Sequence, residues 1–427
     1  MGGGRPFSGS PWGLTRPDLG GAVPTGPVAE LFRGILQRSD KYCLRTWYPQ
    51  QYGQQTGTYL DFGGTDESAI RPAAAAAFGL AVSLSTGAYD PTTTGVAPAD
   101  ARAVCVKLAR SLAYRHRHTA AGGWGWQWQS NMWAALAAQA AWLVADGLTA
   151  QQQRIVADMV VDEADWRLSQ VIPYWKNRAG VELTPGDSKA EESSWNAMLL
   201  QAAVVMLPAH PHRGAWLLNC RKLMISAFSN EADLTSNEVV DGINVSRFLN
   251  GWNLNRDGTV VNHDRLHPDY MTTVLQDLQA VCLFALAGYA PPQSSFHNAD
   301  IVYSGLTSKT FASPPCAAPG GTIYRPDLPD LYYPQGNDWG TGRRMHVAAM
   351  DVMMGAFRQV AGAFHWAQLH GGEVARMQRR STTGQTYIAA GEDTYPGREQ
   401  WVAQHAAWAW LSLWVVSTGK YVPSSSP

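Results

Sequence analysis

The stretch Thr65-Asp-Glu-Ser-Ala-Ile-Arg-Pro-Ala-Ala-Ala-Ala-Ala77 decides the fold class. It opens with Asp66 and Glu67, a helix start signal, because a short acidic side chain there accepts hydrogen bonds from the first backbone amides. It ends in a run of alanines, whose small side chains let neighbouring helices pack closely. A second alanine-rich stretch covers Ala134–Ala141. Both stretches predict helices that are packed tightly against other helices.

Helical patterns separated by Gly, Pro and Asn recur along the whole chain. They predict helices over residues 27–39, 66–86, 98–117, 131–146, 150–170, 188–207, 213–229, 268–289, 345–366 and 397–418. Strand-like pieces are short and lie at residues 259–261, 321–324 and 386–389. Residues 291–344 form the longest segment without a clear helical pattern. We expect this segment to form long loops across one face of the molecule.

These patterns predict an all-α fold. Short and long loops alternate between the helices, which favours helical hairpins closed into a single (α/α) toroid or barrel, with long loops and a few short strands at one end. An α-solenoid is the alternative, but no repeat of about 30 to 45 residues emerges. We expect residues 27–420 to form the toroid domain, residues 1–26 to be a flexible N-terminal segment and residues 421–427 to be a flexible C-terminal tail.

The composition is that of a globular protein and excludes some classes of function. The chain has 427 residues, of which 45% are hydrophobic, and a formal net charge of −1. It indicates no polybasic surface for nucleic acid, and no apolar run of about 18 residues predicts a membrane span. The first residues show no signal-peptide pattern. The five cysteines lack metal-site spacing, so we expect isolated thiols, with one disulfide as the alternative.

The motif Asn262-His263-Asp264-Arg265-Leu266-His267-Pro268-Asp269-Tyr270 lies between a short predicted strand and a predicted helix. Its side chains suit β-elimination of an acidic sugar polymer. That reaction needs a group that neutralises the sugar carboxylate, a base that takes the C5 proton and an acid that protonates the departing O4. The alternative interpretation is a loop whose Asn and Asp cap the helix and whose Tyr packs beneath it.

Five members of this motif have candidate roles. Tyr270 follows His267 by three residues at a helix start, so the phenol and the imidazole can share a face. Asn262 and His263 precede them from the strand side. Arg265 supplies a cation that can neutralise developing charge, and a nearby cation can also lower the pKa of a phenol.

A second motif, PGDSKAEESSWN at residues 185–196, starts another predicted helix. Glu192 and Asn196 are four residues apart and so share one face, with Glu191 across the turn. Acidic residues in a first turn normally complement the helix dipole, a contribution of about 0.3–1 kcal/mol, and this accounts for Asp187. Glu191 and Glu192 lead into an apolar run, which favours a place in a cleft over a solvated face.

Two further motifs predict a sugar-binding surface, although a structured surface loop and ordinary core aromatics are the alternatives. The Gly-rich loop 332–346 displays side chains suited to acidic sugars, since arginine pairs with carboxylates. Its candidates are Tyr333, Gln335, Asn337, Asp338, Trp339, Arg343 and Arg344. In residues 124–131 aromatic rings alternate with amides, a pattern that stacks sugar rings and binds their hydroxyls. Its candidates are Trp124, Trp126, Gln127, Trp128, Gln129 and Asn131.

Four segments, WGWQWQSNMWAA, PGDSKAEESSWNAMLLQAA, GTVVNHDRLHPDYM and YPQGNDWG, together resemble polysaccharide lyase family 38. The resemblance spans roughly residues 59 to 366 and implies an endo-acting lyase on glucuronan or alginate. It implies Tyr270 as the central acid/base and His263 or His267 as its partner. It also implies that Asn196, Asn262 and Glu192 act on the substrate carboxylate, with Arg265 assisting. The family motif has Asn-Ala where this chain has Ser193-Ser194, which bears on subsite contacts and substrate preference.

We therefore expect a secreted, monomeric polysaccharide lyase that cleaves a 1,4-linked uronate polymer and needs no metal or other cofactor. Its partner would be an acidic polysaccharide, and neither nucleic acid nor a membrane. The main alternative is an inverting glycoside hydrolase that uses Glu192 as acid and Asp338 or Asp269 as base. A non-catalytic sugar-binding protein is a third possibility. A terpene cyclase is disfavoured because no DDxxD or DxDD run appears.

Overall fold

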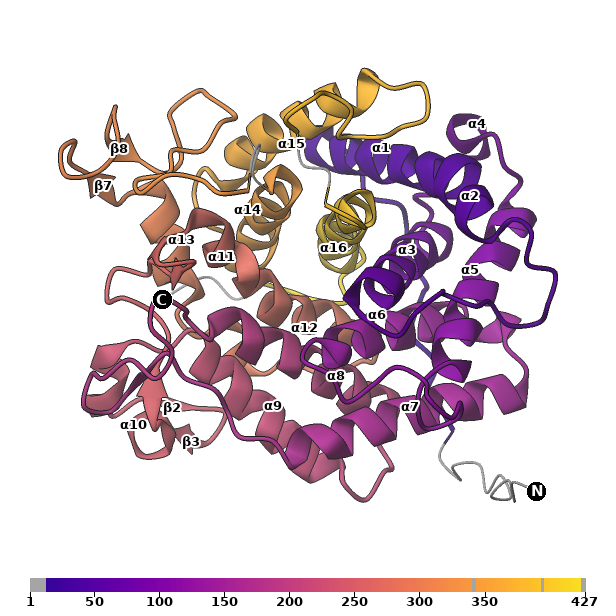
Figure 1. Ribbon diagram of the computed structural model, residues 1–427, viewed down its shortest axis with the longest axis horizontal. Coiled ribbons are helices and arrows are strands. Elements are labelled where there is room, and N and C mark those ends of the chain that lie inside the picture. Colours follow the sequence, from indigo (N-terminus) through magenta and orange to yellow (C-terminus); the bar gives the residue numbers. More distant parts are fainter. Residues whose placement is uncertain (1–12, 340–342, 393–394, 424–427) are drawn as a thin grey trace.

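The computed structural model describes residues 13–339, 343–392 and 395–423, and helices dominate them (Figure 1). The longer helices are α1 (Pro27–Tyr42), α3 (Glu67–Ser85), α5 (Pro98–Tyr114), α6 (Ser130–Leu143), α7 (Ala150–Leu168), α8 (Ala190–Met206), α9 (Arg213–Ala227), α12 (Leu275–Leu286), α13 (Ala299–Thr307), α14 (Arg344–Arg358), α15 (Ala363–Arg379) and α16 (Arg398–Ser417). The short ones are α2 (Tyr48–Tyr52), α4 (Pro91–Thr94), α10 (Val245–Phe248) and α11 (Pro268–Met271). A π-helical turn, η1 (Cys43–Trp47), joins α1 to α2, and the 3-10 turns are η2 (Ala145–Gly147), η3 (Glu231–Thr235), η4 (Thr272–Val274) and η5 (Gln293–Phe296).

The strands of the described residues are two residues long and pair only in antiparallel ladders, β1 with β4, β2 with β3, β5 with β6 and β7 with β8. They are β1 (Lys176–Asn177), β2 (Val239–Val240), β3 (Ile243–Asn244), β4 (Gly251–Trp252), β5 (Val261–Asn262), β6 (Arg265–Leu266), β7 (Thr310–Phe311) and β8 (Gly321–Thr322). The predicted all-α class is confirmed.

The sequence signals for helix starts work as expected. The side chain of Asp66 accepts a hydrogen bond from the backbone N–H of Ala69 at the start of α3. Thr149 and Gln152 form a reciprocal capping box at the start of α7. Such caps satisfy backbone donors that have no partner inside the helix, and each is worth about 1 kcal/mol. Local sequence thus determines where these two helices begin.

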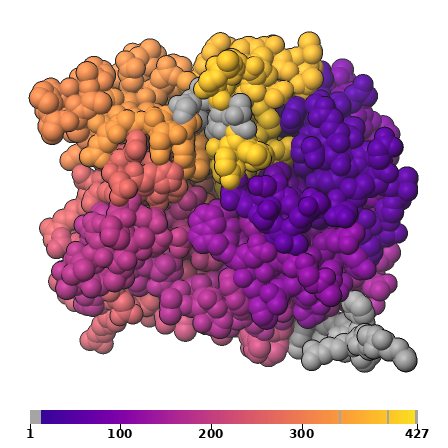
Figure 2. Space-filling view, in the orientation of Figure 1, coloured from indigo at the N-terminus to yellow at the C-terminus, as the bar shows by residue number. Residues whose placement is uncertain are grey.

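The central helices contact one another in a closed cycle. In chain order α3 packs on α6, α6 on α8, α8 on α12 and α12 on α14, while α14 packs on α16 and α16 returns to α3. Helices α5, α7, α9, α15 and α1 pack on the outside of this cycle (Figure 1). Figure 2 shows the result on the surface, where the yellow C-terminal segment lies beside the indigo N-terminal one. This cycle agrees with the (α/α) toroid that we expected. Membership of the toroid fold remains a prediction.

The core explains most of the aromatic residues without any ligand. Alanines of α3 and α6 are fully buried at the contact between these two helices. Eight tryptophans are almost completely buried among the helices: Trp124, Trp133, Trp142, Trp195, Trp216, Trp408, Trp410 and Trp414. Small residues at helix contacts and large rings between them fill the interior efficiently.

The structure differs from the expected helices in the last third of the chain. The helix expected over 345–366 is two helices, α14 and α15. The chain leaves α14 at Gln359, whose φ is 52°, and enters α15 after Gly362, whose φ is 79°. Two left-handed residues within four positions reverse the chain, and the apolar pattern continues on both sides of the reversal. The expected loop region 291–344 contains α13, and residues 386–389 form no strand.

Residues 13–26 belong to the segment that we expected to be flexible, but they have specific contacts. Thr15 bonds the backbone carbonyls of Met206 and Val205 at the end of α8, and its own carbonyl accepts from Trp142. Asp18 donates its N–H to the Leu286 carbonyl at the end of α12. This extended segment therefore covers helix C-termini. Residues 1–12 and 424–427 lie outside the described residues.

All five cysteines lie in the described part of the chain and are free thiols, so the alternative of a disulfide is wrong. Helix α3 is long and apolar enough to cross a membrane, but most of its apolar window is buried inside the structure, as in the core helix of a soluble protein.

Candidate active site

A two-residue turn carries His263 into a cleft. Strands β5 and β6 pair with Asn262 opposite Arg265, so His263 and Asp264 form the turn between them. Their φ angles are 52° and 59°, the positive values of a type I′ hairpin turn. The backbone of Gly186 supports this turn, because its carbonyl accepts from Asp264 N–H, and a Cβ on Gly186 would lie 1.9 Å from the Asp264 carboxylate. Packing thus holds a non-glycine residue in a left-handed conformation at the site.

Four side chains form a continuous hydrogen-bonded chain. The Tyr270 hydroxyl lies 3.1 Å from His263 Nε2, and His263 Nδ1 lies 2.7 Å from one oxygen of Asp338. The other oxygen of Asp338 lies 2.9 Å from His267 Nε2. The side chain of His263 is 40% exposed and that of His267 is 1% exposed. The chain therefore runs from the open cleft into the interior.

The charge on Asp338 fixes the proton positions in this chain. Burial acts to raise the pKa of Asp338, but hydrogen bonds from His263 and His267 hold it below its ordinary value. An ionised carboxylate can only accept, so both imidazoles donate to it. Neutral His263 then carries its proton on Nδ1 and presents Nε2 to the phenol of Tyr270. Burial lowers the pKa of His267, which favours the neutral form of that imidazole also.

Tyr270 is held rigidly and stays protonated at rest. It lies in α11, which Pro268 starts with its fixed φ. Its ring packs against Trp339 and His267, each with a centroid separation of 4.9 Å. Burial raises the pKa of Tyr270, and the nearby carboxyl of Glu191 raises it further. The phenol is therefore a proton donor at neutral pH.

Two adjoining cavities meet at this phenol. The larger has a volume of about 650 Å³ and the smaller of about 260 Å³. They share Trp128, Glu191, His263 and Tyr270 as lining residues, so together they form one cleft that passes the phenol. We call the larger cavity the arginine side, after Arg71, Arg343 and Arg398 in its wall. We call the smaller cavity the acidic side, after Asp187, Glu192 and Asp264 in its wall.

Lysine neutralises part of the acidic side. Lys189 Nζ lies 2.6 Å from the Asp187 carboxylate and 2.9 Å from that of Glu192. Glu192 also accepts a hydrogen bond from the indole of Trp128, at 3.3 Å. Asp264 is exposed at the hairpin turn. This wall thus retains negative charge where it faces the cleft.

Glu191 separates the two sides. Burial raises its pKa to about 7, although Arg343 and Arg71 act in the opposite direction. Its Oε1 lies 3.9 Å from Arg343 Nη1. Near neutral pH a substantial fraction of this carboxyl is protonated and can donate a hydrogen bond into the cleft.

The structure brings many of the predicted residues to the cleft wall. These are Trp128, Gln129, Glu191, Glu192, Asn262, His263, Tyr270, Asp338, Trp339 and Arg343. Gln129 is itself held by Arg71, whose Nη1 lies 3.3 Å from its Oε1. His267 lies directly behind Asp338 and does not line the cavities.

Other predicted residues build the wall without lining it. Arg265 donates to the His263 carbonyl at 3.2 Å and thus braces the hairpin, which differs from the expected contact with substrate charge. Gln335 accepts from Leu266 N–H and so fastens the loop 332–339 to the same hairpin. Asn337 accepts from Trp339 N–H at 2.8 Å within that loop.

Three asparagines near the acidic side also have structural partners. The side-chain amide of Asn262 donates to the Asp187 carboxylate, at 3.0 Å, and to the Ser188 carbonyl. Asn131 donates to Asn196 Oδ1 at 3.0 Å, and both are buried and lie outside the two cavity walls. These positions do not support a direct role of Asn131 and Asn196 at the substrate, because their side chains join α6 to α8, while Glu192, one turn before Asn196, lines the cleft.

The structure places several predicted sugar contacts outside the two cavities. Trp124 is completely buried and donates to the Leu112 carbonyl. Trp126 stacks with Arg117 at 3.8 Å, and neither it nor Gln127 lines the two cavities. The alternation of rings and amides misled the prediction because Gly125 and the positive φ of Trp126 turn the chain, so that successive side chains do not face one way.

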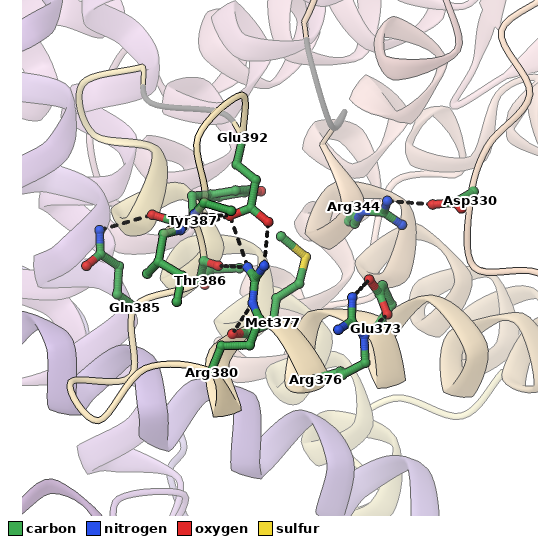
Figure 3. A network of polar contacts seen from close by, with 12 residues as sticks. Asp330, Arg344, Glu373, Arg376, Met377, Arg380, Gln385, Thr386, Tyr387 and Glu392 are labelled. Carbon is green, nitrogen blue, oxygen red and sulfur yellow. Dashed lines mark hydrogen bonds and ion pairs between the residues drawn. The ribbon is translucent and has the colours of Figure 1, made fainter.

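Arg344 and Tyr333 also point away from the cleft. Arg344 pairs with Asp330 (Figure 3) and also donates to the Pro329 carbonyl. Tyr333 donates to the buried Asp269 at 3.2 Å. Asp269 also accepts from the backbone N–H of Arg343 and lines neither cavity, which removes it as a hydrolytic base.

Sequence reasoning missed much of the arginine side. Its wall includes Arg71, Tyr395, Arg398, Trp401 and His405, together with His346 at the end of the loop 332–346. The first five come from α3, α16 and the loop before α16, and each sits in an apolar or unremarkable stretch of sequence. Glu392 in that loop also lines the cavity, and Arg380 holds it at 2.6 Å (Figure 3). A cation inside an alanine-rich helix, such as Arg71, is the signal that could have been used.

The expectation of no metal needs one addition. His263, His267 and Asp338 offer three ligand atoms that lie within 4.8 Å of one another, a set that could hold a metal ion. Imidazole and carboxylate suit zinc and similar ions. The same atoms are already joined by hydrogen bonds at 2.7 and 2.9 Å, which account for the arrangement without an ion.

Comparison of the chain with protein-family models, with curated proteins and with solved structures gives no match. The resemblance to polysaccharide lyase family 38 therefore rests on the quoted motifs alone.

Proposed function

We propose that the protein is a polysaccharide lyase that cleaves a 1,4-linked uronate polymer, glucuronan or alginate/polymannuronate, by β-elimination. The observation that carries this proposal is the chain from Tyr270 through His263 to Asp338 at the junction of two cavities. A proton donor and a proton acceptor lie side by side there, with cations and a partly protonated carboxyl next to them.

The reaction would use these groups as follows. A base takes the C5 proton, and the electrons of the C5–H bond form the C4–C5 double bond while the C4–O4 bond breaks. The departing O4 receives a proton. Tyr270 is suited to give that proton because its phenol is neutral at rest. The base is either His263 through Nε2, or Tyr270 itself after its proton has passed to His263 at 3.1 Å.

Two groups next to the phenol can make the C5 proton acidic. Arg343 lies over the Tyr270 ring, with Cζ 5.8 Å from its centroid. Protonated Glu191 can donate a hydrogen bond to a sugar carboxylate, and its burial supplies that protonated form near neutral pH. Stabilising the charge that develops on the carboxylate during proton removal is commonly the largest contribution to catalysis of this kind.

A cleft that continues on both sides of the phenol supports endo-acting cleavage within a chain. We also propose that the protein is secreted, because its polymeric substrate lies outside the cell. We propose that it acts as a monomer. The proposed chemistry uses side chains of this chain and assigns no step to a metal or other cofactor.

Ultraviolet absorbance of the 4,5-unsaturated product tests the proposal. Glucuronan, polymannuronate and polyguluronate are incubated separately with the purified protein. We expect absorbance to rise with at least one of them. No absorbance with any uronate, together with reducing sugar released from a neutral glycan, would reject the lyase.

A second function is supported by one observation. Glu191 and Asp338 both line the arginine side. The pKa of Glu191 is raised to about 7, whereas that of Asp338 is held below its ordinary value. Two carboxyls with separated pKa values are what a glycoside hydrolase uses as acid and base. In this alternative Glu191 takes the role of the acid that we had assigned to Glu192, because the Glu192 carboxylate forms an ion pair with Lys189. A saturated product would identify hydrolysis.

A further inference from the structure

Three arginines that are far apart in the sequence surround one indole ring. The guanidinium carbon of Arg71 lies 3.9 Å from the centroid of Trp401, that of Arg398 lies 4.4 Å away and that of Arg343 lies 4.9 Å away. Tyr395 flanks the group, with its ring centroid 5.3 Å from Arg71 and 5.4 Å from Arg398. Arginine stacks favourably on aromatic faces, so the rings hold the guanidinium groups in place.

Carboxylates nearby do not satisfy the hydrogen-bonding capacity of Arg71 and Arg343. Arg71 forms an ion pair with Glu67, but its Nε and Nη2 are buried and have no hydrogen-bond partner. Arg343 is also buried, its Nε has no hydrogen-bond partner, and its nearest carboxylate, Glu191, lies 3.9 Å from Nη1. Burying charged donors without acceptors costs several kcal/mol. The cluster is therefore preorganised to receive an anion.

Two neutral histidines line the cavity beside the arginines. His346 and His405 stack on each other with ring centroids 3.6 Å apart, and both line the cavity. Burial lowers the pKa of both, and the adjacent arginines lower it further, so the rings are neutral and do not add a competing charge.

The cluster lies next to the proposed reaction centre and extends away from it. Arg343 belongs to both places, since its guanidinium contacts Trp401 on one side and lies over the Tyr270 ring on the other. Arg71 and Arg398 line the same cavity and contact the same Trp401 ring as Arg343. A sugar chain that places one carboxylate at Arg343 and Glu191 would bring the next sugar toward Arg71 and Arg398.

We propose that Arg71 and Arg398, on either side of Trp401, bind the carboxylate of the sugar adjacent to the one that reacts at Tyr270. The substrate would then carry acidic groups on consecutive sugars, as a homopolymeric uronate does, and chains in which uronate alternates with a neutral sugar would be poor substrates. The substrate part of this inference rests on the proposed lyase function, whereas the anion site itself does not.

Binding of a small probe tests the anion site without any turnover. The melting temperature of the full chain is measured with sodium glucuronate and with glucose at equal ionic strength, so that the ligands differ only in the carboxylate. We expect glucuronate to raise the melting temperature and glucose to leave it unchanged. Arg71→Gln and Arg398→Gln should lose this increase, whereas Arg358→Gln, which removes a half-buried arginine paired with Asp300 outside the cleft, should keep it.

Two outcomes would overturn the site: equal responses to glucose and glucuronate, or an undiminished response to glucuronate in both cleft variants. If Arg71→Gln fails to fold, Arg398→Gln carries the test. Arg398→Lys is a further check, because it keeps the charge but loses the paired N–H geometry, and we expect an intermediate shift.

Cleavage of two polymers tests the substrate class. We expect kcat/KM on glucuronan to exceed that on hyaluronan, where glucuronate alternates with a neutral sugar, by at least about tenfold. Arg398→Gln should narrow this ratio. Equal rates on both polymers, or an equal loss on both in the variant, would overturn the inference. Absence of unsaturated product from every uronate would reject the lyase instead, and the glucuronate measurement would still decide the anion site.

Discussion

On one side of Tyr270 the cleft wall presents guanidinium groups carried by helices, and on the other it presents carboxylates carried by loops. Arg71 lies within α3 and Arg398 begins α16, and these helices pack against each other. Asp187 and Asp264 lie in the loop before α8 and in the β5–β6 turn. The polyanionic substrate that we propose would meet opposite fields on the two sides, so we expect its binding energy to come mainly from the arginine side.

The two sides also differ in how firmly their side chains are held. The arginines are buried among rings and cannot move without disturbing the helix contacts. The acidic wall is more exposed, and salt and solvent screen it. The phenol lies where these two environments meet. We therefore expect the arginine side to determine substrate affinity and the junction to determine the rate. The acidic side should change the affinity only slightly.

The largest effect is expected from Tyr270→Phe at the junction. The substitution removes one hydroxyl and its hydrogen bond to His263 but keeps the ring and its packing. The expected loss in kcat is about 10²- to 10⁴-fold, the usual contribution of a positioned acid or base. KM should change little, because the arginine side is intact.

Rates come from absorbance of the unsaturated product, and a melting curve checks the fold. Trp126→Phe is a matched control, since this aromatic residue lies outside the two cavities. A Tyr270→Phe variant with normal kcat would remove the phenol from the mechanism.

The next largest effect is expected from Asp338→Asn. The amide cannot accept from both imidazoles as the carboxylate does, so His263 is no longer fixed with Nε2 facing the phenol. Because this residue acts through His263, we expect kcat to fall by about 10- to 100-fold. The pH profile should also shift, since the carboxylate that favours protonated His267 is gone.

A chelator separates this interpretation from a metal site at the same residues. Dialysis of the wild-type protein against a chelator should leave activity unchanged if His263, His267 and Asp338 form a proton chain. Loss of activity that one divalent ion restores would assign the set to a metal.

A smaller, pH-dependent effect is expected from Glu191→Gln between the two sides. The folded protein raises the Glu191 pKa from 4.5 to about 7, so the carboxyl is neutral below that pH. Wild-type activity should decline as the pH rises through about 7, and the glutamine variant, which keeps a donor, should lack this decline.

Stability should follow the same shift with a defined sign. Because the folded-state pKa is above the unfolded value, the contribution to the free energy of unfolding is complete below pH 4.5 and is lost as the pH rises to about 7. The loss should be about 1 to 3 kcal/mol and absent in Glu191→Gln. A wild-type protein whose stability is constant over that range would show that Glu191 is ionised throughout.

The two sides also differ in how well the sequence reveals them. The helix starts, the all-α class and the loop motifs around His263 and Asp338 follow from local patterns, since neighbouring residues build them. Arg71 and Arg398 could not be found this way, because they join Arg343 only when α16 returns to α3 and closes the cycle of helices. Local pattern thus identifies groups on one loop or turn, and it misses a site made by tertiary packing.

The predicted site residues that lie outside the cleft wall have a related explanation. Asn196 lies one turn after Glu192 in α8, but only Glu192 lines the cleft, whereas Asn196 bonds to Asn131 of α6. Arg344 follows Arg343 directly, yet the start of α14 directs the two side chains to opposite surroundings. The chemistry of a motif can be recognised in a sequence, whereas the direction of each side chain depends on partners that lie elsewhere in the chain.

The smallest effect is expected from Asp264→Asn on the acidic side. Asparagine tolerates the positive φ of 59° at this turn, so the hairpin should keep its shape. Removal of one exposed negative charge should lower KM for a polyanionic chain by no more than about threefold, and the gain should disappear in high salt because exposed charges are screened. KM measured at low and high ionic strength checks this. An increase in KM would mean that Asp264 binds sugar hydroxyls directly and that the two sides share the work of binding.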